Sequence, residues 1–383
     1  MKKLLCVLLL LTLFPLPCRA VEVLQGDALS LSAPSAALLE QETGTLLYEK
    51  DAHTKRPIAS VTKVMTLLLT MEAIESGRLH WDDPITASAH AAGMGGSQIW
   101  LEEGEEMTAE ELIKCITVVS ANDCSVAMAE HLAGSEEAFV AAMNEKAQEL
   151  GMADTHFMNC TGLFDDPEHY STAYDVALMA RALMNHKDIQ RFTTIWTDTA
   201  RNGAFGLSNT NKLIRFYPGA TGLKTGFTGG AMYCLAATAE REGTAYVAAV
   251  LGDDTSAGRF ESARTLLNHG FARYLVADFT EGISLPPVPV VLGRETYVLP
   301  VCQGSPKFLL EKGQKQALCY VPELPKSIEA PVTESTPLGS VTVYAGEEVL
   351  ARFPLHADRN SSRLGTLDIF HKLLEILLCK SGI

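Results

Sequence analysis

The sequence predicts an α+β protein in which helices and antiparallel hairpins share one large domain, followed by a small all-β domain. Between residues 57 and 274, helix-length apolar patterns with start and stop signals alternate with short apolar runs joined by turns. From about residue 278, prolines cluster and short β-branched runs replace these helical patterns. A final helical pattern over 366–383 has one broad apolar face.

The first 20 residues are typical of a secretion signal. Lys2 and Lys3 precede an apolar run from Leu4 to Leu16, and the small residue Ala20 suits a cleavage point. The apolar run is too short for a stable membrane anchor. We therefore expect residues 1–20 to be removed and the protein to act on the outer side of the cytoplasmic membrane.

Length and charge indicate the number of domains and the classes of binding partner that are excluded. The 383 residues leave room for two domains, and we divide the mature chain into 21–277, 278–356, and a linker and helix over 357–383. The net charge is −15, and it becomes −18 when the three basic residues of the first 20 are lost. A chain this acidic is a poor partner for nucleic acid or for a strongly anionic surface.

Cysteine and histidine usage predicts neither a disulfide framework nor a metal site. Of nine cysteines, seven remain after residue 20, an odd number with scattered spacing and no Cys-x-x-Cys. Buried free thiols are the favoured interpretation, with Cys302–Cys319 left open as a pair. The ten histidines form no His-Glu-x-x-His or other metal-ligand spacing, so we expect no metal and no cofactor.

The most informative stretch runs from Pro57 to Thr66. Ser60 and Lys63 are three residues apart, so a helix places them on one face. Proline suits the first turn of this helix and Gly77 suits its end. A lysine in an apolar wall loses hydration and is pushed towards its neutral form, and a neutral amine can take the proton of an attacking hydroxyl. The wall is formed by Val61, Val64, Met65, Leu67, Leu68, Leu69 and Met71.

The flanking pattern predicts a hairpin over 36–48 before this helix and several helices after it. Thr108 and Glu111 form a capping box for one helix, and Asp123 is predicted to cap the next, which would leave Ser120 and Asn122 in the turn between the two. The stretch 159–170 is polar and lacks periodicity. Further helices are expected over 135–151, 172–185 and 256–274, with a hairpin over 233–251.

Three short motifs occur in order along this domain: Ser60-x-x-Lys63, Ser120-x-Asn122 and Lys224-Thr225-Gly226. Each has an ordinary alternative, such as a polar pair on a solvated helix or a helix cap, but the ordered set is specific to serine acyl transfer. Ser60 would attack a carbonyl, Lys63 would accept its proton, and Ser120 would relay that proton to the leaving amine.

The third motif suits recognition of a substrate carboxylate. Lys224 and Thr225 offer a positive charge and a hydroxyl, and Gly226 leaves room for a substrate chain along the strand edge.

With these motifs the chain resembles the low-molecular-mass penicillin-binding proteins, the D-alanyl-D-alanine carboxypeptidases. The resemblance is close over residues 30–275. It implies a transpeptidase/β-lactamase-like catalytic domain, an antiparallel sheet flanked by helices, with Asn122 among the substrate-binding residues and an oxyanion hole formed by the Ser60 and Phe227 N–H groups. Ala121 and Met232 depart from the family pattern, which usually has glycine there. The stretches that carry the resemblance are 56–63, 94–98, 120–123, 159–163 and 222–228.

The expected function is removal of the terminal D-alanine from peptidoglycan stem pentapeptides, with β-lactams as acylating ligands. A β-lactamase using the same site is an alternative, but no Glu-x-x-Leu-Asn stretch lies between Ser120 and Lys224 to supply its deacylating base. A catalytically weak wall-binding or scaffold protein is the other alternative, which the intact motifs disfavour.

The terminal pattern over 366–383 is too short and too charged to span a membrane but suits its surface. Leu367, Phe370, Leu374, Leu377 and Leu378 share one face, opposite four charged side chains. We expect this helix to attach the protein to the outer surface of the cytoplasmic membrane. Docking on its own chain or on a partner is the alternative.

Overall fold

A computed structural model describes residues 23–279, 283–302 and 306–379. The chain forms two compact units: the larger holds Val21–Val276, and the smaller takes in the chain from Ala277 onward. The segment 1–20, interpreted above as a secretion signal, lies outside the described residues.

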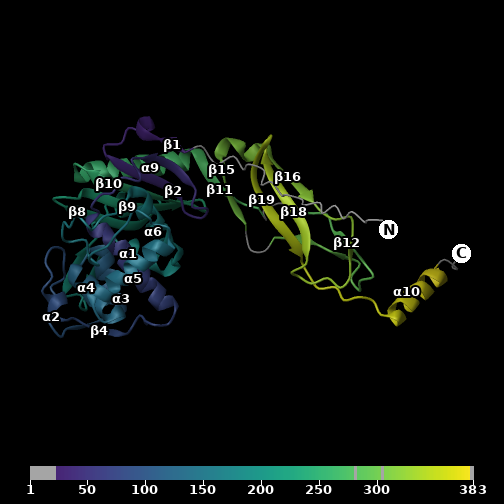
Figure 1. Ribbon diagram of the computed structural model, residues 1–383, viewed down its shortest axis with the longest axis horizontal. Coiled ribbons are helices and arrows are strands. Elements are labelled where there is room, and N and C mark those ends of the chain that lie inside the picture. The colour runs from purple at the N-terminus through teal and green to yellow at the C-terminus, as the bar shows by residue number, and fades with distance from the viewer. Residues whose placement is uncertain (1–22, 280–282, 303–305, 380–383) are drawn as a thin grey trace, which may run out of the picture. The chain divides into compact units, whose positions relative to one another are not determined.

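A six-stranded sheet organises the larger unit, with strand order β1-β3-β2-β10-β9-β8 (Figure 1). Neighbouring strands are antiparallel, except that β1 runs parallel to β3. Every residue of β2 is buried, because helix α9 packs on β9 and β10 while helix α6 packs on β2 and β10. The strands are β1 (Leu24–Gln25), β2 (Ser35–Glu40), β3 (Leu46–Lys50), β8 (Ala220–Thr228), β9 (Met232–Arg241) and β10 (Thr244–Asp253).

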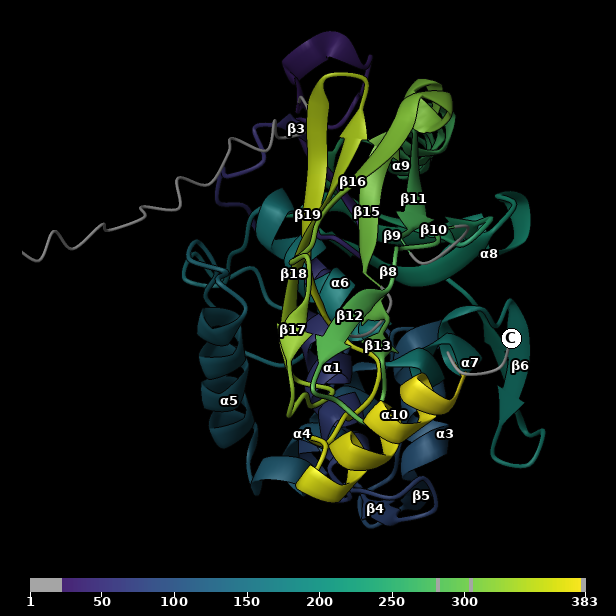
Figure 2. The same cartoon turned by 90° about the vertical axis from the view of Figure 1, so that its right-hand side faces the viewer.

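A group of helices lies on the side of the sheet opposite α9, and both views show α1, α3 and α4 together there (Figures 1 and 2). The predicted threonine and serine caps form: the hydroxyls of Thr108, Ser135 and Thr172 each accept a backbone N–H of the first turn. The helices are α1 (Lys63–Glu75), α2 (Ala89–Ala92), α3 (Ala109–Val118), α4 (Asn122–Ala133), α5 (Glu136–Glu149), α6 (Ala173–Asn185) and α9 (Ser256–Arg273).

Short elements complete this unit, several of which the sequence pattern did not indicate. They are too brief to show a helical or strand period. They comprise the turn η1 (Gly26–Ala28), the hairpin β4 (Pro84–Thr86) with β5 (Glu106–Thr108), η3 (Lys187–Ile189), α7 (Gln190–Thr193), the hairpin β6 (Thr197–Ala200) with β7 (Phe205–Ser208), and α8 (Leu213–Phe216).

The smaller unit is built mainly of strands. A four-stranded sheet has the order β14-β19-β18-β16, and a three-stranded sheet has the order β13-β12-β17. Cys302 and Cys319 are both free thiols, so no disulfide joins them. Strand β11 (Tyr274–Asp278) begins in the last residues of the larger unit and ends in the smaller one. The elements that follow are β12 (Val288–Val291), β13 (Tyr297–Val298), β14 (Pro300–Val301), β15 (Lys307–Glu311), η4 (Lys312–Ala317), β16 (Leu318–Glu323), β17 (Ile328–Glu329), β18 (Pro337–Ala345) and β19 (Glu348–Ala357).

The last element is helix α10 (Thr366–Cys379), shorter than the predicted 366–383, whose final four residues lie outside the described chain. Of its described apolar side chains, Leu367 is 76% exposed and Phe370 is 60% exposed, whereas the side chains of Leu377 and Leu378, predicted on the same face, lie outside the described part of the chain. Among the described residues, no helix combines the length and the hydropathy needed to cross a bilayer.

Candidate active site

Ser60 and Lys63 meet at the start of the buried helix, as their spacing predicts. Ser60 lies in a 3-10 turn, η2 (Ala59–Thr62), and α1 begins at Lys63 itself. The lysine Nζ donates to Ser60 Oγ at 3.0 Å and to the Thr161 carbonyl oxygen at 2.7 Å. Ala59 has a φ of +46°, a conformation that non-glycine residues rarely adopt. The preceding turn therefore holds the serine hydroxyl directly against the lysine amine.

The environment of Lys63 favours its neutral form. Its side chain is fully buried, and burial lowers the pKa of the amine from 10.5 to about 7, against a smaller opposite effect of Cys160 and Asp123. An amine with a pKa near neutrality is half unprotonated at physiological pH and still basic enough to accept a proton. Lys63 thus meets both requirements of a general base for Ser60.

The second motif lies where α3 gives way to α4. Ser120 has a φ of +65° and is almost fully buried, and its Oγ has no hydrogen-bond partner among the described residues. Asn122 is the first residue of α4, and its side-chain amide donates to the Gly95 carbonyl oxygen at 2.7 Å. The Ser120 hydroxyl therefore remains available to a ligand.

The predicted capping role of Asp123 is wrong. The N-cap of α4 is Ala121, which forms no side-chain cap, and Asp123 lies one residue inside the helix. One oxygen of its carboxylate accepts the N–H groups of Ile99 and Leu101, at 3.0 and 3.1 Å. This buried carboxylate therefore fixes the 95–101 segment beside the motif, a tertiary contact that local sequence cannot reveal.

The third motif forms part of edge strand β8, which passes close to the turn η2 that carries Ser60. A Cβ atom added to Gly226 would lie 2.7 Å from the Ile58 carbonyl oxygen and 3.1 Å from the Val61 nitrogen. Glycine is therefore required for this approach, beyond the room for substrate predicted from sequence. Thr225 Oγ1 donates to Thr210 Oγ1 at 2.7 Å, and Phe227 is 54% exposed.

Lys224 is buried without an anionic partner. Its Nζ donates to the Thr225 carbonyl oxygen at 3.0 Å, and no carboxylate pairs with it in the described part of the chain. Burial lowers the pKa of its amine well below 10.5, and the positive charges of Lys63 and Arg259 lower it further. Arg259 itself donates to the Gly226 carbonyl oxygen at 2.9 Å. The site thus gathers three basic groups, none of which forms an ion pair with a carboxylate among the described residues.

Sequence reasoning did not identify Arg259, because it lies on α9, far from all three motifs in the chain. His169 was also missed. Its Nε2 lies 2.8 Å from Thr62 Oγ1, its Nδ1 accepts the Met158 N–H, and burial lowers its pKa to about 4. The neutral His169 therefore connects the 159–170 loop to the turn η2, through Thr62.

The same loop also contacts the far end of β8. Asp165 accepts hydrogen bonds from Thr228 Oγ1 and from the Gly230 N–H, the latter at 2.9 Å. At its other end, Thr161 accepts the Lys63 amine. The loop therefore bridges the base and the β8–β9 turn.

Comparison with known proteins agrees with this geometry. Residues 22–255 match the family described as D-alanyl-D-alanine carboxypeptidase, and residues 279–363 match the C-terminal domain of penicillin-binding protein 5. The chain belongs to the D-alanyl-D-alanine carboxypeptidase family.

Relatives cover nearly the whole chain. The D-alanyl-D-alanine carboxypeptidase DacF of Bacillus subtilis is 38% identical over 98% of each chain. Penicillin-binding protein 5 of Haemophilus influenzae is similar with a TM-score of 0.76 and 25% identity, over 88% of this chain and 99% of that one. Penicillin-binding protein D2 of Listeria monocytogenes, solved in an ampicillin-bound form, is 34% identical with a TM-score of 0.58, over 63% of this chain and 99% of that one. The predicted α+β fold, family and serine peptidase class are confirmed.

The methionine at position 232, where the family pattern usually has glycine, adopts a backbone conformation that glycine would favour. Met232 begins β9 with a φ of +55°, a conformation in which glycine carries no steric penalty. The strand nevertheless pairs with β8 through the full motif, with Thr228 opposite Met232 and Lys224 opposite Ala236. The change therefore leaves the register of the Lys-Thr-Gly strand intact.

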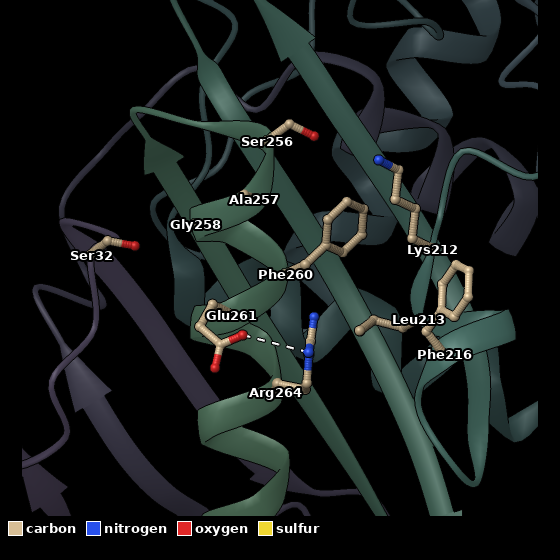
Figure 3. Close-up of a pocket in the computed structure, with 10 residues that line it drawn as sticks. All are labelled: Ser32, Lys212, Leu213, Phe216, Ser256, Ala257, Gly258, Phe260, Glu261 and Arg264. Atoms are coloured by element: carbon tan, nitrogen blue, oxygen red, sulfur yellow. Dashed lines mark ion pairs between the residues drawn. The ribbon is translucent and has the colours of Figure 1, made fainter.

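A cavity of about 870 Å³ lies elsewhere in this unit, between α8 and the first turns of α9. Figure 3 shows Phe260 and Arg264 of α9 on one side and Leu213 and Phe216 on the other. None of the motif residues lines it, so we do not assign the reaction to it. Among the described residues, no group of histidine, cysteine, aspartate and glutamate side chains could hold a metal ion.

Proposed function

We propose that the protein removes the terminal D-alanine from peptidoglycan stem pentapeptides through an acyl-enzyme on Ser60. The observation that carries this proposal is the 3.0 Å contact between Ser60 Oγ and the buried, low-pKa Lys63 amine. Ser60 Oγ attacks the carbonyl carbon of the penultimate D-alanine as Lys63 takes its proton. The N–H groups of Ser60 and Phe227 stabilise the oxyanion.

The remaining steps use the other motif residues. Ser120 passes the proton from Lys63 to the amide nitrogen, the C–N bond breaks, and D-alanine leaves. A water molecule then hydrolyses the ester and restores Ser60. Asn122 and the β8 edge hold the peptide, while Lys224, Thr225 and Gly226 accommodate the terminal carboxylate.

The unpaired basic groups support a carboxylate-terminated substrate. Lys224 and Arg259 are buried together, and neither forms an ion pair with a carboxylate of the described chain, although the charge of Asp253 partly offsets the effect of burial on the pKa of Arg259. A peptide carboxylate would supply the missing negative charge and restore the ammonium form of Lys224. β-Lactams carry a carboxylate and an acylating carbonyl, and we propose that they acylate the same serine.

The test is acylation by labelled penicillin together with mass spectrometry of a stem pentapeptide. Wild type should retain one label per chain and release D-alanine, whereas Ser60→Ala should do neither. Ser76→Ala, a matched change at the C-terminal end of the same helix, should behave as wild type. Retention of the label by Ser60→Ala would place the nucleophile elsewhere, and rapid release of hydrolysed penicillin would favour a β-lactamase.

We also propose that residues 1–20 direct secretion and that α10 attaches the protein to the outer surface of the cytoplasmic membrane. The exposed apolar side chains of Leu367, Phe370, Leu373 and Leu374 support this attachment. The proposed arrangement is a catalytic domain over 21–277, a β-rich domain over 278–356 and this surface helix.

A further inference from the structure

Trp100 is held at the surface in an unfavourable backbone conformation. Its side chain is 63% exposed, and its φ of +57° is rare for a large residue. The N–H groups on either side, of Ile99 and Leu101, both donate to Asp123, and its own carbonyl oxygen accepts from Arg201 Nη2 at 3.0 Å. Three hydrogen bonds therefore impose a conformation that exposes an indole ring to solvent.

The ring itself is fixed at its edges. The Phe205 ring, on β7, contacts it edge-to-face with centroids 5.7 Å apart and an interplanar angle of 64°. The Gln98 amide is oriented so that its nitrogen donates to the Met94 carbonyl oxygen. In that orientation the Gln98 side-chain oxygen accepts from Trp100 Nε1 at 3.3 Å. A ring that is already immobile offers an apolar face to a ligand at little further cost in conformational entropy.

Arg201 connects this aromatic pair to the hairpin formed by β6 and β7. Its guanidinium donates to the Ile99 and Trp100 carbonyl oxygens and also donates two hydrogen bonds to the Glu105 carboxylate, at 2.7 and 2.8 Å. The segment with Trp100 and the hairpin with Phe205 are therefore fastened to each other, and neither ring lies on a free loop.

Both segments lead directly to the active site. The carbonyl oxygen of Ser97, three residues before Trp100, accepts the Asn122 N–H at 2.7 Å, so at most roughly 10 Å of backbone separates the Trp100 Cα from the Ser97 Cα. On the other side, the chain leaving β7 reaches Thr210, which bonds Thr225. The two rings thus lie on segments that each contact a motif residue within a few positions along the chain.

We infer that Trp100 and Phe205 form a subsite for a sugar ring of the glycan strand that carries the stem peptide. The flat C–H face of a pyranose packs on an indole, and its hydroxyl rim suits polar neighbours such as Arg201 and Glu105. This inference rests on the proposed function, because it assumes a peptide attached to a glycan.

The surrounding charge favours this neutral ligand over an anionic wall polymer. Glu102, Glu103 and Glu106 follow Trp100 closely in the chain, and all three are exposed. Like charges at this position would repel a polyanion, whereas an N-acetylated sugar brings no charge to the site.

The test compares two substrates: a free stem pentapeptide, and the same peptide on an N-acetylglucosaminyl-N-acetylmuramyl disaccharide. For each protein, the measurement is the ratio of kcat/KM for the disaccharide peptide to that for the free peptide. Trp100→Ala should lower this ratio about three- to tenfold, chiefly through KM, as expected for the loss of one aromatic contact. Trp100→Phe retains an aromatic face and should keep the ratio within about twofold of wild type.

Phe216→Ala is the matched control, because Phe216 is also 63% exposed but contacts Trp196 instead. It should leave the ratio unchanged. Equal losses on both substrates in Trp100→Ala would mean that Trp100 only supports the Asn122 turn, and a larger loss on the free peptide would mean that it contacts the stem peptide. Either result would overturn the sugar subsite. If wild type hydrolyses neither substrate, the proposed function itself fails.

Discussion

At the scale of single residues, the sequence allowed prediction of contacts within one helical turn and missed contacts between distant segments. The Ser60–Lys63 contact follows from a three-residue spacing, and the apolar wall around Lys63 predicted its lowered pKa. The roles of Asp123 and Arg259 depend on partners brought close only by the fold. Aspartate is a residue type that often caps helices, so the sequence around Asp123 predicted a cap. The structure instead places its carboxylate on the N–H of Ile99.

The pKa of Lys63 predicts how acylation depends on pH. Only the neutral amine can accept the Ser60 proton, so the acylation rate with labelled penicillin should rise about tenfold per pH unit below about 7 and level off above it. The measurement is the second-order acylation rate constant between pH 5 and pH 9. A rate that stays constant across this range would exclude Lys63 as the titrating base.

The same shift predicts a stability effect of definite sign. The folded pKa of about 7 lies below the ordinary value of 10.5, so between these values the unfolded chain binds more protons at Lys63. The contribution of this residue to the free energy of unfolding therefore rises with pH across that window. Lys63→Met removes the penalty of burying an amine, so it should raise Tm at pH 7 while abolishing acylation.

Lys224 provides a test of carboxylate recognition. Removing a charge-assisted hydrogen bond costs about 1.5–3 kcal/mol, or roughly ten- to over a hundredfold. Lys224→Gln should lose that factor on a stem peptide with a free C-terminus and much less on the same peptide with an amidated end. The measurement is kcat/KM for both peptides in both proteins, read as a double difference. Equal losses would assign Lys224 to the chemical step or to the fold.

At the scale of elements, hydrophobic periodicity predicted the long helices and the hairpins, and side-chain caps located several of their ends. Thr108, Ser135 and Thr172 each cap the helix that they were expected to begin. The hairpin of β6 and β7 was not predicted, since strands of four residues carry too little alternation. The 159–170 loop was predicted as irregular, but its contacts on both sides of the site were not visible from the sequence.

Asp165 fastens that loop to the β8–β9 turn, and its removal should loosen the site. Asp165→Ala deletes the acceptor for Thr228 and Gly230, so hydrogen exchange of the 159–170 amides should accelerate and kcat/KM on the pentapeptide should fall about two- to tenfold. Asp166→Ala is the matched control in the same loop, since the Asp166 carboxylate accepts the Glu168 N–H of that loop and has no hydrogen bond to another element in the described part of the chain. Unchanged exchange in Asp165→Ala would show that the loop is held by other contacts.

At the scale of the whole molecule, the net negative charge and the terminal helix determine how the protein is expected to bind a membrane surface. The net charge of −15 opposes adsorption to an anionic surface by charge, so the proposed attachment depends on apolar side chains. In α10, Leu367, Phe370, Leu373 and Leu374 provide exposed apolar area at one end of the chain.

If α10 attaches the protein to the membrane, removing this helix should abolish attachment without affecting peptidase activity. The mature protein should sediment with membranes or lipid vesicles, and truncation after Arg363 should release it with its activity on a soluble peptide intact. Sedimentation in high salt distinguishes apolar insertion from charge attraction, because only the latter is screened. Full-length mature protein that remains in the supernatant would refute the attachment.

The close approach of backbone around Ser60 restricts how this enzyme can change over evolutionary time. A Cβ atom at Gly162 would lie 1.9 Å from the Ala59 carbonyl oxygen, and one at Gly226 would lie 2.7 Å from that of Ile58. Neither contact can be relieved by a side-chain movement, so variants that exclude an inhibitor by narrowing the site from these positions would lose the fold as well. Adaptation should instead act through exposed side chains such as Phe227, which follows the Lys-Thr-Gly motif directly, where a substitution can be accommodated without moving the backbone around Ser60.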